Sequence, residues 1–210
     1  MKQAVTQYLA SLEFEATTHQ ADQIATYAQL LWDANSRVNL TRHTDEEAFL
    51  VRDLRDSVLL SAHLEEGDHV LDIGSGGGVP GILLAILRPD VSVSLAESIG
   101  KKADALSQFV STLEIPVAVY NDRAENVVSQ CHFDVLTVRA VGSITKLCTL
   151  LKGHWHEFTR MLALKGPNWP QEVEEARREL SRRRVSVECL ERYDMHATET
   201  QAAILELRRR

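Results

Sequence analysis

The chain has 210 residues, of which 44% are hydrophobic and 25% are charged, and its formal net charge is −7. These values are typical of a soluble globular protein and argue against one that is coated with basic surface for nucleic acid. No apolar run is long enough to cross a bilayer, and the first sixteen residues lack the apolar core of a signal peptide. We therefore expect a cytoplasmic protein that does not contact membranes.

Apolar residues recur at intervals of three and four in the first part of the chain, which is the spacing of amphipathic helices. Two such helices are predicted over residues 3–16 and 20–34. A third is predicted over residues 45–63, with Thr44 or Asp45 as its N-cap. These helices lie ahead of the segment in which strands begin.

From residue 68 onwards, runs typical of strands alternate with helical patterns. The strands are predicted over 69–73, 91–96, 116–120, 133–138, 158–164, 185–190 and 202–207, and the helices between them over 82–87, 101–113, 143–151 and 172–184. The last two strands are expected to form a terminal hairpin. The alternation predicts an α/β fold: a mostly parallel, seven-stranded, Rossmann-like sheet with helices on both faces. We divide the chain into a helical extension, 1–63, packed on a core domain, 64–210.

One glycine-rich segment, from Val70 to Gly81, reads VLDIGSGGGVPG. Its apolar start is typical of a buried strand, and the strand stops abruptly in glycine, which lets a ligand approach the backbone closely. Pro80 suits the first turn of a helix. Strand, loop and helix together predict a cradle for a nucleotide-like cofactor at the carboxyl ends of the strands.

Two cofactor classes compete for this cradle. Gly76 to Gly81 fits the G-x-G-x-x-G pattern of NAD-binding proteins, but that pattern should begin where the strand ends. The alternative frame consists of Asp72, Gly74, Gly76 and Gly78, and it resembles motif I of S-adenosylmethionine-dependent methyltransferases. A cationic sulfonium cofactor without pyrophosphate is compatible with the nearby Asp72, so we favour the second frame over NAD and over a purely structural turn.

Charged residues follow three further strands at the same edge. Glu97 ends the second strand, where a carboxylate can accept hydrogen bonds from the hydroxyls of a cofactor ribose. Ala124 and Glu125 follow the third strand, beside the expected adenine. Arg139 ends the fourth strand and either faces the crevice or forms a structural ion pair with Asp72, Glu97 or Glu125, because a buried arginine needs a partner.

The sequence also resembles one methyltransferase family along most of its length. The residues that carry the resemblance are Asn39-Leu40-Thr41, Leu50-Val51-Arg52, Asp56-Ser57, the segment from Asp72 to Ile82, Glu97-Ser98, Lys101-Lys102, Arg123-Ala124-Glu125, Arg139-Ala140 and Ala163-Leu164-Lys165-Gly166. They stand in the order seen in the RsmG (GidB) family, the bacterial 16S ribosomal RNA guanine-N7 methyltransferases. The resemblance implies a class I methyltransferase fold, S-adenosyl-L-methionine as cofactor, and methylation of one guanine of 16S ribosomal RNA within the small ribosomal subunit. We also expect a monomer.

The resemblance, the glycine-loop frame and the positions of the strand ends together indicate which residues form the site. The expected cofactor residues are Asp72, Gly74, Gly76, Gly78, Val79, Glu97, Ala124, Glu125 and Arg139. Arg139, Arg123 and Lys165 are expected to act on the substrate: Arg139 orients the base or the cofactor, and the other two lie near the RNA backbone. Lys101 and Lys102 are expected to reach phosphates on the same side.

The chain departs from the family pattern at Asp53, where a histidine is usual, at Glu97, where aspartate is common, and in its Arg-rich tail. Two other functions stay open: an NAD-dependent oxidoreductase, and a methyltransferase-like ribosome-binding or assembly factor without catalysis. We predict no metal site, because Cys131, Cys148 and Cys189 are far apart and His154 and His156 lack a third ligand nearby.

Overall fold

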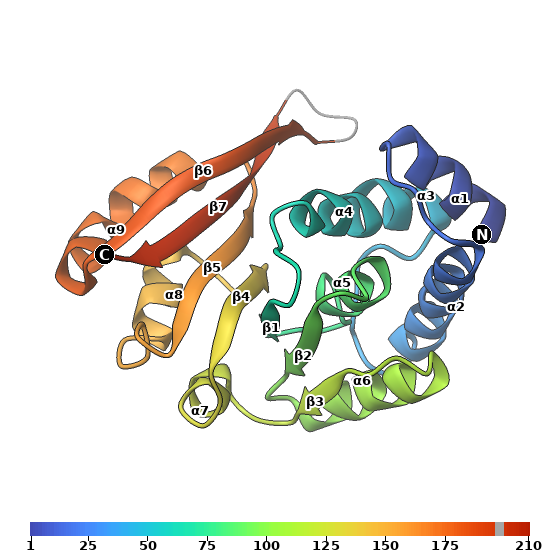
Figure 1. The fold of residues 1–210 in the computed structure, drawn as a ribbon, viewed down its shortest axis with the longest axis horizontal. Helices are drawn as coiled ribbons and strands as arrows, with labels where there is room; N and C mark the ends of the chain where they lie inside the picture. Colours follow the sequence, from blue (N-terminus) through green and yellow to red (C-terminus); the bar gives the residue numbers. More distant parts are fainter. Residues whose placement is uncertain (196–199) are drawn as a thin grey trace.

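A computed structural model describes residues 1–195 and 200–210. Its centre is a seven-stranded sheet in the order β3-β2-β1-β4-β5-β7-β6 (Figure 1). The strands are β1 (His69–Ile73), β2 (Ser92–Ala96), β3 (Ala118–Tyr120), β4 (Phe133–Arg139), β5 (Phe158–Lys165), β6 (Val185–Asp194) and β7 (Gln201–Arg209). β1 to β5 pair in parallel, whereas β7 is antiparallel to both of its neighbours. The predicted mostly parallel sheet and the terminal hairpin are confirmed.

Helices cover both faces of this sheet. They are α1 (Lys2–Ser11), α2 (Thr18–Asn35), α3 (Glu46–Ala48), α4 (Arg55–Ser61), α5 (Gly81–Leu87), α6 (Gly100–Thr112), α7 (Ala124–Val128), α8 (Ile144–Leu150) and α9 (Trp169–Arg183). The buried residues of α1, α2, α4, α5 and α6 belong to one apolar cluster, and those of α7, α8 and α9 to another (Figure 1). Val70 of β1 joins the first cluster and Leu71 joins the second, as the alternation of side chains along a strand requires.

The order of the strands reverses between β1 and β4. β1 pairs with β2 on one side and with β4 on the other, so the connections from these strands leave in opposite directions. In parallel sheets this switch opens a crevice outside the carboxyl ends of the strands. The glycine-rich loop after β1 and the residues that end β2 and β4 meet there.

The expected helix over 45–63 is not continuous. Asp45 is its N-cap, as predicted, and its carboxylate accepts a hydrogen bond from the Ala48 amide at 2.8 Å. After the single turn α3, however, the chain forms the π-helical segment η1 (Phe49–Leu54) before α4 begins. π-Helical turns alter which side chains face inward, and here Asp53 is fully buried.

Several other boundaries differ from the prediction. The first helix ends at Ser11 rather than at residue 16, and α9 begins at Trp169, where Pro170 provides a suitable first turn. The short helix α7 was expected to be loop. β6 extends to Asp194 rather than residue 190, with a register irregularity between Cys189 and Glu191.

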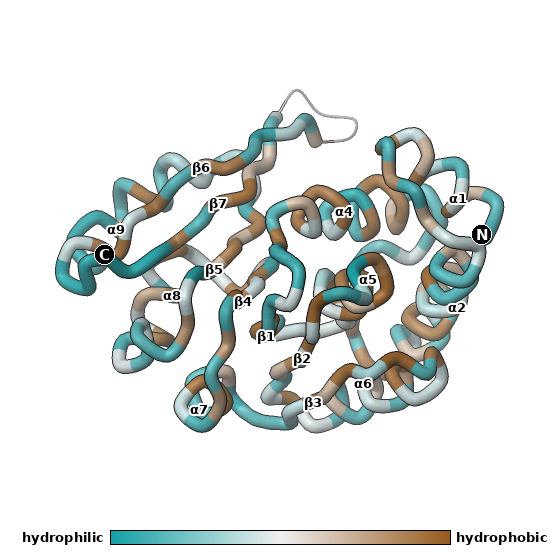
Figure 2. The backbone as a smooth tube through the Cα atoms, in the orientation of Figure 1, coloured by the Kyte–Doolittle hydropathy of each residue, from teal (hydrophilic) through white to brown (hydrophobic). Residues whose placement is uncertain are grey.

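The N-terminal helices share their core with the sheet. Tyr27 of α2 is fully buried, and its hydroxyl donates to the Gly77 carbonyl of the glycine-rich loop at 2.8 Å. Figure 2 shows α5, which this extension helps to enclose, as mostly hydrophobic, whereas α9 is mostly hydrophilic. No helix in the described part of the chain combines the length and hydrophobicity that a membrane span requires.

Candidate active site

The glycine-rich loop takes a conformation that other residues rarely adopt. Gly74, Gly76 and Gly78 have φ angles of 68°, 57° and 101°, in the left-handed region. Asp72 secures the base of the loop: its carboxylate accepts from the Gly81 amide at 3.3 Å and from the Thr137 hydroxyl at 3.0 Å. Burial raises the pKa of Asp72 to about 6, although these hydrogen bonds act in the opposite direction.

The glycines have different surroundings. A Cβ built on Gly81 would lie 2.3 Å from Leu95, and one on Gly77 would lie 3.1 Å from the Leu40 carbonyl oxygen, so both positions are filled by protein. A Cβ on Gly76 would meet no atom closer than 3.8 Å. The backbone at Gly76 is therefore the part of the cradle that a ligand can approach.

Glu97 lies beside this free position. It is only 5% exposed, and its two carboxylate oxygens accept from the amides of Gly76 at 2.9 Å and Ile99 at 2.8 Å. A carboxylate offers about four acceptor positions in all, so two such bonds leave capacity for hydroxyl donors. Glu97 is thus held in place by backbone amides and is not a solvated carboxylate at the end of its strand.

A cavity of about 270 Å³, here called the glycine-loop cavity, opens beside Gly74 at the start of the loop, and neither Gly76 nor Glu97 belongs to its lining. Its lining includes Gly74, Ser98, Ala124, Glu125 and Val141. Three of the predicted cofactor residues therefore share one cavity. Asp72 stands apart from it, because that side chain is buried beneath the loop and supports it from within the protein.

Arg139 is the centre of a buried network of charges. Its guanidinium donates to Asp53 at 2.5 Å and to Asp56 at 3.1 Å. The second oxygen of Asp56 accepts from the Tyr193 hydroxyl at 2.8 Å, and Asp53 also contacts Nδ1 of His43 at 2.8 Å. Arg139 was predicted to pair with Asp72, Glu97 or Glu125 if its role were structural; the structure gives it two other partners, both from the N-terminal extension.

Burial and charge act against each other in this network. Burial raises the pKa of Asp56 above its ordinary value, even though Arg139 and Tyr193 favour the carboxylate. Burial also disfavours the charge on Arg139, but the attraction of Asp53 and Asp56 outweighs it, so the pKa of Arg139 is raised. The second oxygen of Asp53 is buried without a hydrogen-bond partner among the described residues.

A second cavity, of about 300 Å³, is lined by Arg139 and is called the arginine cavity. Arg52, Arg139, Leu164 and Tyr193 are among its lining residues. The residues that follow β4 separate it from the glycine-loop cavity: Val141 lines the first cavity, and Gly142 lines the second. The backbone at Val141 and Gly142 thus forms a short partition between the two cavities, and the arrangement suits two ligands that meet at this partition.

The predicted basic residues differ in their availability. Arg123 lies on the glycine-loop cavity with a side chain 74% exposed. Lys101 is exposed at the start of α6. Lys165, expected near the RNA backbone, lines the arginine cavity at the end of β5, but its side chain is only 7% exposed and donates to Glu172 at 2.8 Å and to the Gly142 carbonyl. A buried ammonium requires such partners.

Sequence reasoning missed the contribution of Tyr193. The strand that carries it was expected to end at residue 190, so no role was considered for it, although an aromatic residue three positions beyond an apolar run is compatible with a longer strand. Arg52 and Asp56 were noted only as parts of a family resemblance. The structure brings both of them to the arginine cavity.

Comparison with known proteins places these features in a family context. The family model described as rRNA small subunit methyltransferase G matches residues 20–199. Over 151 residues the chain is 50% identical to "Ribosomal RNA small subunit methyltransferase G" of Rhodopirellula baltica; the match spans 72% of this chain and 65% of that relative. A protein of the same name from Photobacterium profundum is 36% identical over 176 residues, which span 83% of this chain and 85% of the relative.

Solved structures show the same fold at much lower sequence identity. Magnesium protoporphyrin IX methyltransferase from Synechocystis, crystallised with bound SAM, superposes with a TM-score of 0.60 at 12% identity and spans 88% of this chain and 97% of its own. TrmK of M. capricolum, in complex with S-adenosyl-homocysteine, gives a TM-score of 0.56 at 12% identity over 73% of this chain and 67% of its own. The predicted Rossmann-like methyltransferase fold is confirmed.

Proposed function

Because the chain belongs to the rRNA small subunit methyltransferase G family, we propose that it transfers a methyl group from S-adenosylmethionine to N7 of one guanine in 16S ribosomal RNA. The observation that supports the proposal most directly is the pair of adjoining cavities at the carboxyl ends of β1 and β4. One has the features of a nucleoside site, and the other has room for an acceptor.

The residues of the glycine-rich loop and those of the glycine-loop cavity fit the cofactor. The open space above Gly76 accommodates a ligand that lies against the backbone, and Glu97 has free acceptor positions for ribose hydroxyls. Ala124 and Ser98 offer a small apolar surface and a hydroxyl for the adenine ring. When bound, S-adenosylmethionine supplies an electrophilic methyl group on a sulfonium sulfur.

The arginine cavity is the proposed site for the guanine. N7 carries a lone pair that is not protonated at neutral pH and accepts hydrogen bonds on the major-groove edge of the base. With S-adenosylmethionine bound, this lone pair would take the methyl group directly, and the electron pair of the broken carbon–sulfur bond would stay on sulfur. No proton has to be removed, so catalysis depends on alignment, which contributes up to about 7–11 kcal/mol in well-oriented reactions.

The state of Asp56, the carboxylate closest to Arg139 in the arginine cavity, agrees with this choice of acceptor. One of its oxygens accepts from Arg139 and the other accepts from the Tyr193 hydroxyl. An acceptor that must lose a proton requires a base within hydrogen-bond reach. A carboxylate held on both oxygens is poorly placed to act as that base, which suits an acceptor that needs none.

The individual roles are part of the proposal. Arg139, fixed by Asp53 and Asp56, orients the base at the partition between the cavities. Arg123 is exposed and available to RNA phosphates. Lys165 positions the partition through the Gly142 carbonyl instead of contacting RNA. Because A-form RNA places N7 in a deep and narrow groove, the target guanine has to be unpaired or flipped out of the stack.

The test is methyl transfer from labelled S-adenosylmethionine to small ribosomal subunits that lack the modification, with naked 16S RNA alongside. We expect label at guanine N7, and we expect stronger labelling of the assembled subunit, since an acidic protein binds free RNA weakly. Binding of S-adenosylmethionine without transfer to either substrate would contradict the proposed reaction and favour a role in ribosome binding or assembly.

A further inference from the structure

The positive charge of this chain is concentrated in its last sixty residues. Residues 151–210 contain 12 Lys and Arg against 10 Asp and Glu, whereas residues 1–150 contain 11 against 20. The acidic total of the protein therefore conceals one basic segment. Six of its arginines occur as two triplets, 182–184 and 208–210.

The fold brings the two triplets together. α9 ends at Arg183, and β6 begins two residues later at Val185, which pairs with Arg209 at the end of β7. The Arg210 amide donates to the Arg184 carbonyl at 2.7 Å. Two triplets that are 26 positions apart in the sequence thus form one basic end of the molecule, which Figure 2 shows as hydrophilic.

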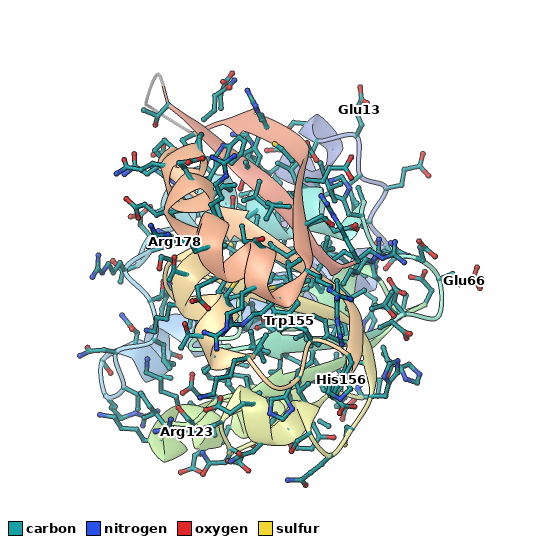
Figure 3. The ribbon with its side chains drawn as sticks, turned by 90° about the vertical axis from the view of Figure 1, so that its left-hand side faces the viewer. Glu13, Glu66, Arg123, Trp155, His156 and Arg178 are labelled. Carbon is teal, nitrogen blue, oxygen red and sulfur yellow. The ribbon has the colours of Figure 1, made fainter. Side chains whose placement is uncertain are left out.

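This end contains a cleft of about 650 Å³, here called the basic cleft. Lys152, His156, Arg182, Arg184 and Arg209 line it, and they come from the loop before β5, the end of α9 and the end of β7. In Figure 3, α9 and the loop that carries Trp155 and His156 face the viewer. Cations from three separate elements therefore converge on one concave surface.

The charges in the basic cleft are largely uncompensated. Glu179 is the one acidic residue among the lining residues that the structure describes, and it is paired with Arg183. Lys152, Arg182, Arg184 and Arg209 are exposed, and none forms an ion pair with a described residue. Nε1 of Trp155 and Nε of Arg183 are buried donors without a partner in the same described part. The cleft has an excess of both positive charge and donors.

The basic cleft lies at the opposite end of the sheet from the proposed active site. It adjoins the residues that precede β5, whereas the arginine cavity includes Leu164 and Lys165 at the end of that strand. Eight residues at about 3.3 Å each separate the two sites by about 25 Å. A single nucleotide cannot reach both, so the cleft requires a ligand that extends beyond the target base.

We propose that the basic cleft binds backbone phosphates of the small-subunit RNA, away from the guanine that enters the active site. This inference rests on the proposed function, which makes that RNA the substrate. Arginine predominates over lysine in the cleft, and its planar donor fork matches phosphate oxygens in pairs. Phosphates spaced regularly along a strand also suit cations that come from three elements, and this favours RNA over an acidic protein surface.

The experiment compares two double variants of the full chain. Arg182→Gln with Arg209→Gln removes two charges from the basic cleft. As a control, Lys2→Gln with Arg37→Gln removes two exposed charges from the N-terminal extension, one from α1, where Lys2 pairs with Asp22, and one from the turn after α2. Binding is measured over a range of salt concentrations to unmodified small ribosomal subunits and to naked 16S RNA, with S-adenosylhomocysteine present. Methyl transfer and S-adenosylmethionine affinity are measured in parallel.

A plot of log affinity against log salt has a negative slope, and the cleft variant is expected to make it shallower by about 1.4–1.8 for both RNA substrates. Each lost phosphate contact contributes about 0.7–0.9 to that slope. KM for the subunit rises at least tenfold, while kcat and cofactor affinity stay at wild-type values. A slope equal to that of the control variant overturns the proposal. Weaker binding to subunits with unchanged binding to naked RNA also overturns it and indicates an acidic protein partner.

The two proposals fail in different ways. If the wild-type protein binds RNA with a cleft-dependent salt slope but transfers no methyl group, the RNA contact is supported and the proposed reaction is wrong. If methyl transfer proceeds and the cleft variant matches the control, the reaction is supported and the RNA contact at the cleft is wrong.

Discussion

Tyr193 holds the carboxylate that in turn holds Arg139, so its hydroxyl tests the positioning network without removing a charge. We expect Tyr193→Phe to lower kcat for methyl transfer about tenfold, because Asp56 loses a buried hydrogen bond and Arg139 becomes less well oriented. Stability should fall by about 1 kcal/mol, the usual net contribution of such a bond. Cofactor affinity, measured by calorimetry, should not change.

Tyr120→Phe is the matched control, since Tyr120 is a half-buried tyrosine of β3 that lines neither cavity and interacts with Cys131 rather than with Asp56. Equal kcat values for the two variants would show that the Tyr193 hydroxyl does not position the site.

The pH dependence of stability tests whether the pKa of Asp72 is raised in the folded protein. Its pKa in the folded protein is about 6, compared with 3.8 for an unperturbed carboxyl, because burial disfavours the charged form. The folded state therefore binds more protons than the unfolded state between these values, and this group's contribution to stability is complete below about pH 4 and is lost as pH rises through 6. The loss corresponds to about 3 kcal/mol at neutral pH.

Asp72→Asn removes the titration and keeps the shape of the side chain. Chemical denaturation at pH 4, 5, 6 and 7 measures the free energy of unfolding, and we expect that of the variant to increase relative to that of the wild type as pH rises. Asp104→Asn, at an exposed position of α6, serves as the control. A pH-independent difference between wild type and Asp72→Asn would contradict the raised pKa.

At the scale of the elements, the glycine-rich loop has two roles that fall on neighbouring glycines. Gly76 faces space that is open to a ligand, and Gly77 packs against the protein. Gly76→Ala introduces a methyl group into the open part of the cradle at a φ of 57°, so we expect cofactor affinity to fall at least tenfold and stability to fall by about 1 kcal/mol. Gly77→Ala directs its methyl group at Leu31 and the Leu40 carbonyl. That variant should lose stability with a smaller effect on affinity.

Calorimetric titration with S-adenosylmethionine and urea denaturation of both variants measure the two effects. Equal losses of affinity would show that the loop responds as one unit and that the free space above Gly76 is not the ligand position.

The N-terminus of α2 gives a second prediction at this scale. Thr17 and Gln20 form a capping box, and the Gln20 amide also donates to the Ile86 and Leu87 carbonyls at the end of α5. We expect Thr17→Ala to lower stability by about 1 kcal/mol, as loss of an N-cap usually does. Thr6→Ala, inside α1, should cost less, because threonine is a poorer helix former than alanine. Thermal denaturation distinguishes them.

Most elements could be predicted because their signals are local. The strand and glycine loop around Asp72 combine apolar residues with an abrupt run of glycines, and Glu97 follows the next strand at the expected edge. Helix η1 could not be predicted, since nothing in its apolar spacing distinguishes a π-helical turn from an α-helix. The change from α-helix to π-helix at this point depends on tertiary contacts, among them the buried pairing of Asp53 with Arg139.

At the scale of the whole molecule, the partners of charged residues were the least predictable feature. Arg139 was correctly placed at the end of β4, but its partners Asp53 and Asp56 are more than 80 residues away in the sequence. Lys165 is buried by Glu172, which was considered only as part of a charged helix. The sequence shows the position of each charged residue along its element. The oppositely charged partner of that residue depends on how distant segments pack in the folded chain.

The position of β7 has a consequence for the order of folding. β5 is the last strand of the parallel series, yet its outer neighbour arrives about forty residues later, when Leu164 pairs with Ile204. Pairing over such a separation is slow, because the entropy of closing the loop opposes it before any contact forms. Until the hairpin docks, β5 has an open edge that can pair with other chains. Tyr193 and Asp194 also remain away from α4 until then, so the maturation of the acceptor site is expected to be the last and most aggregation-sensitive step of folding.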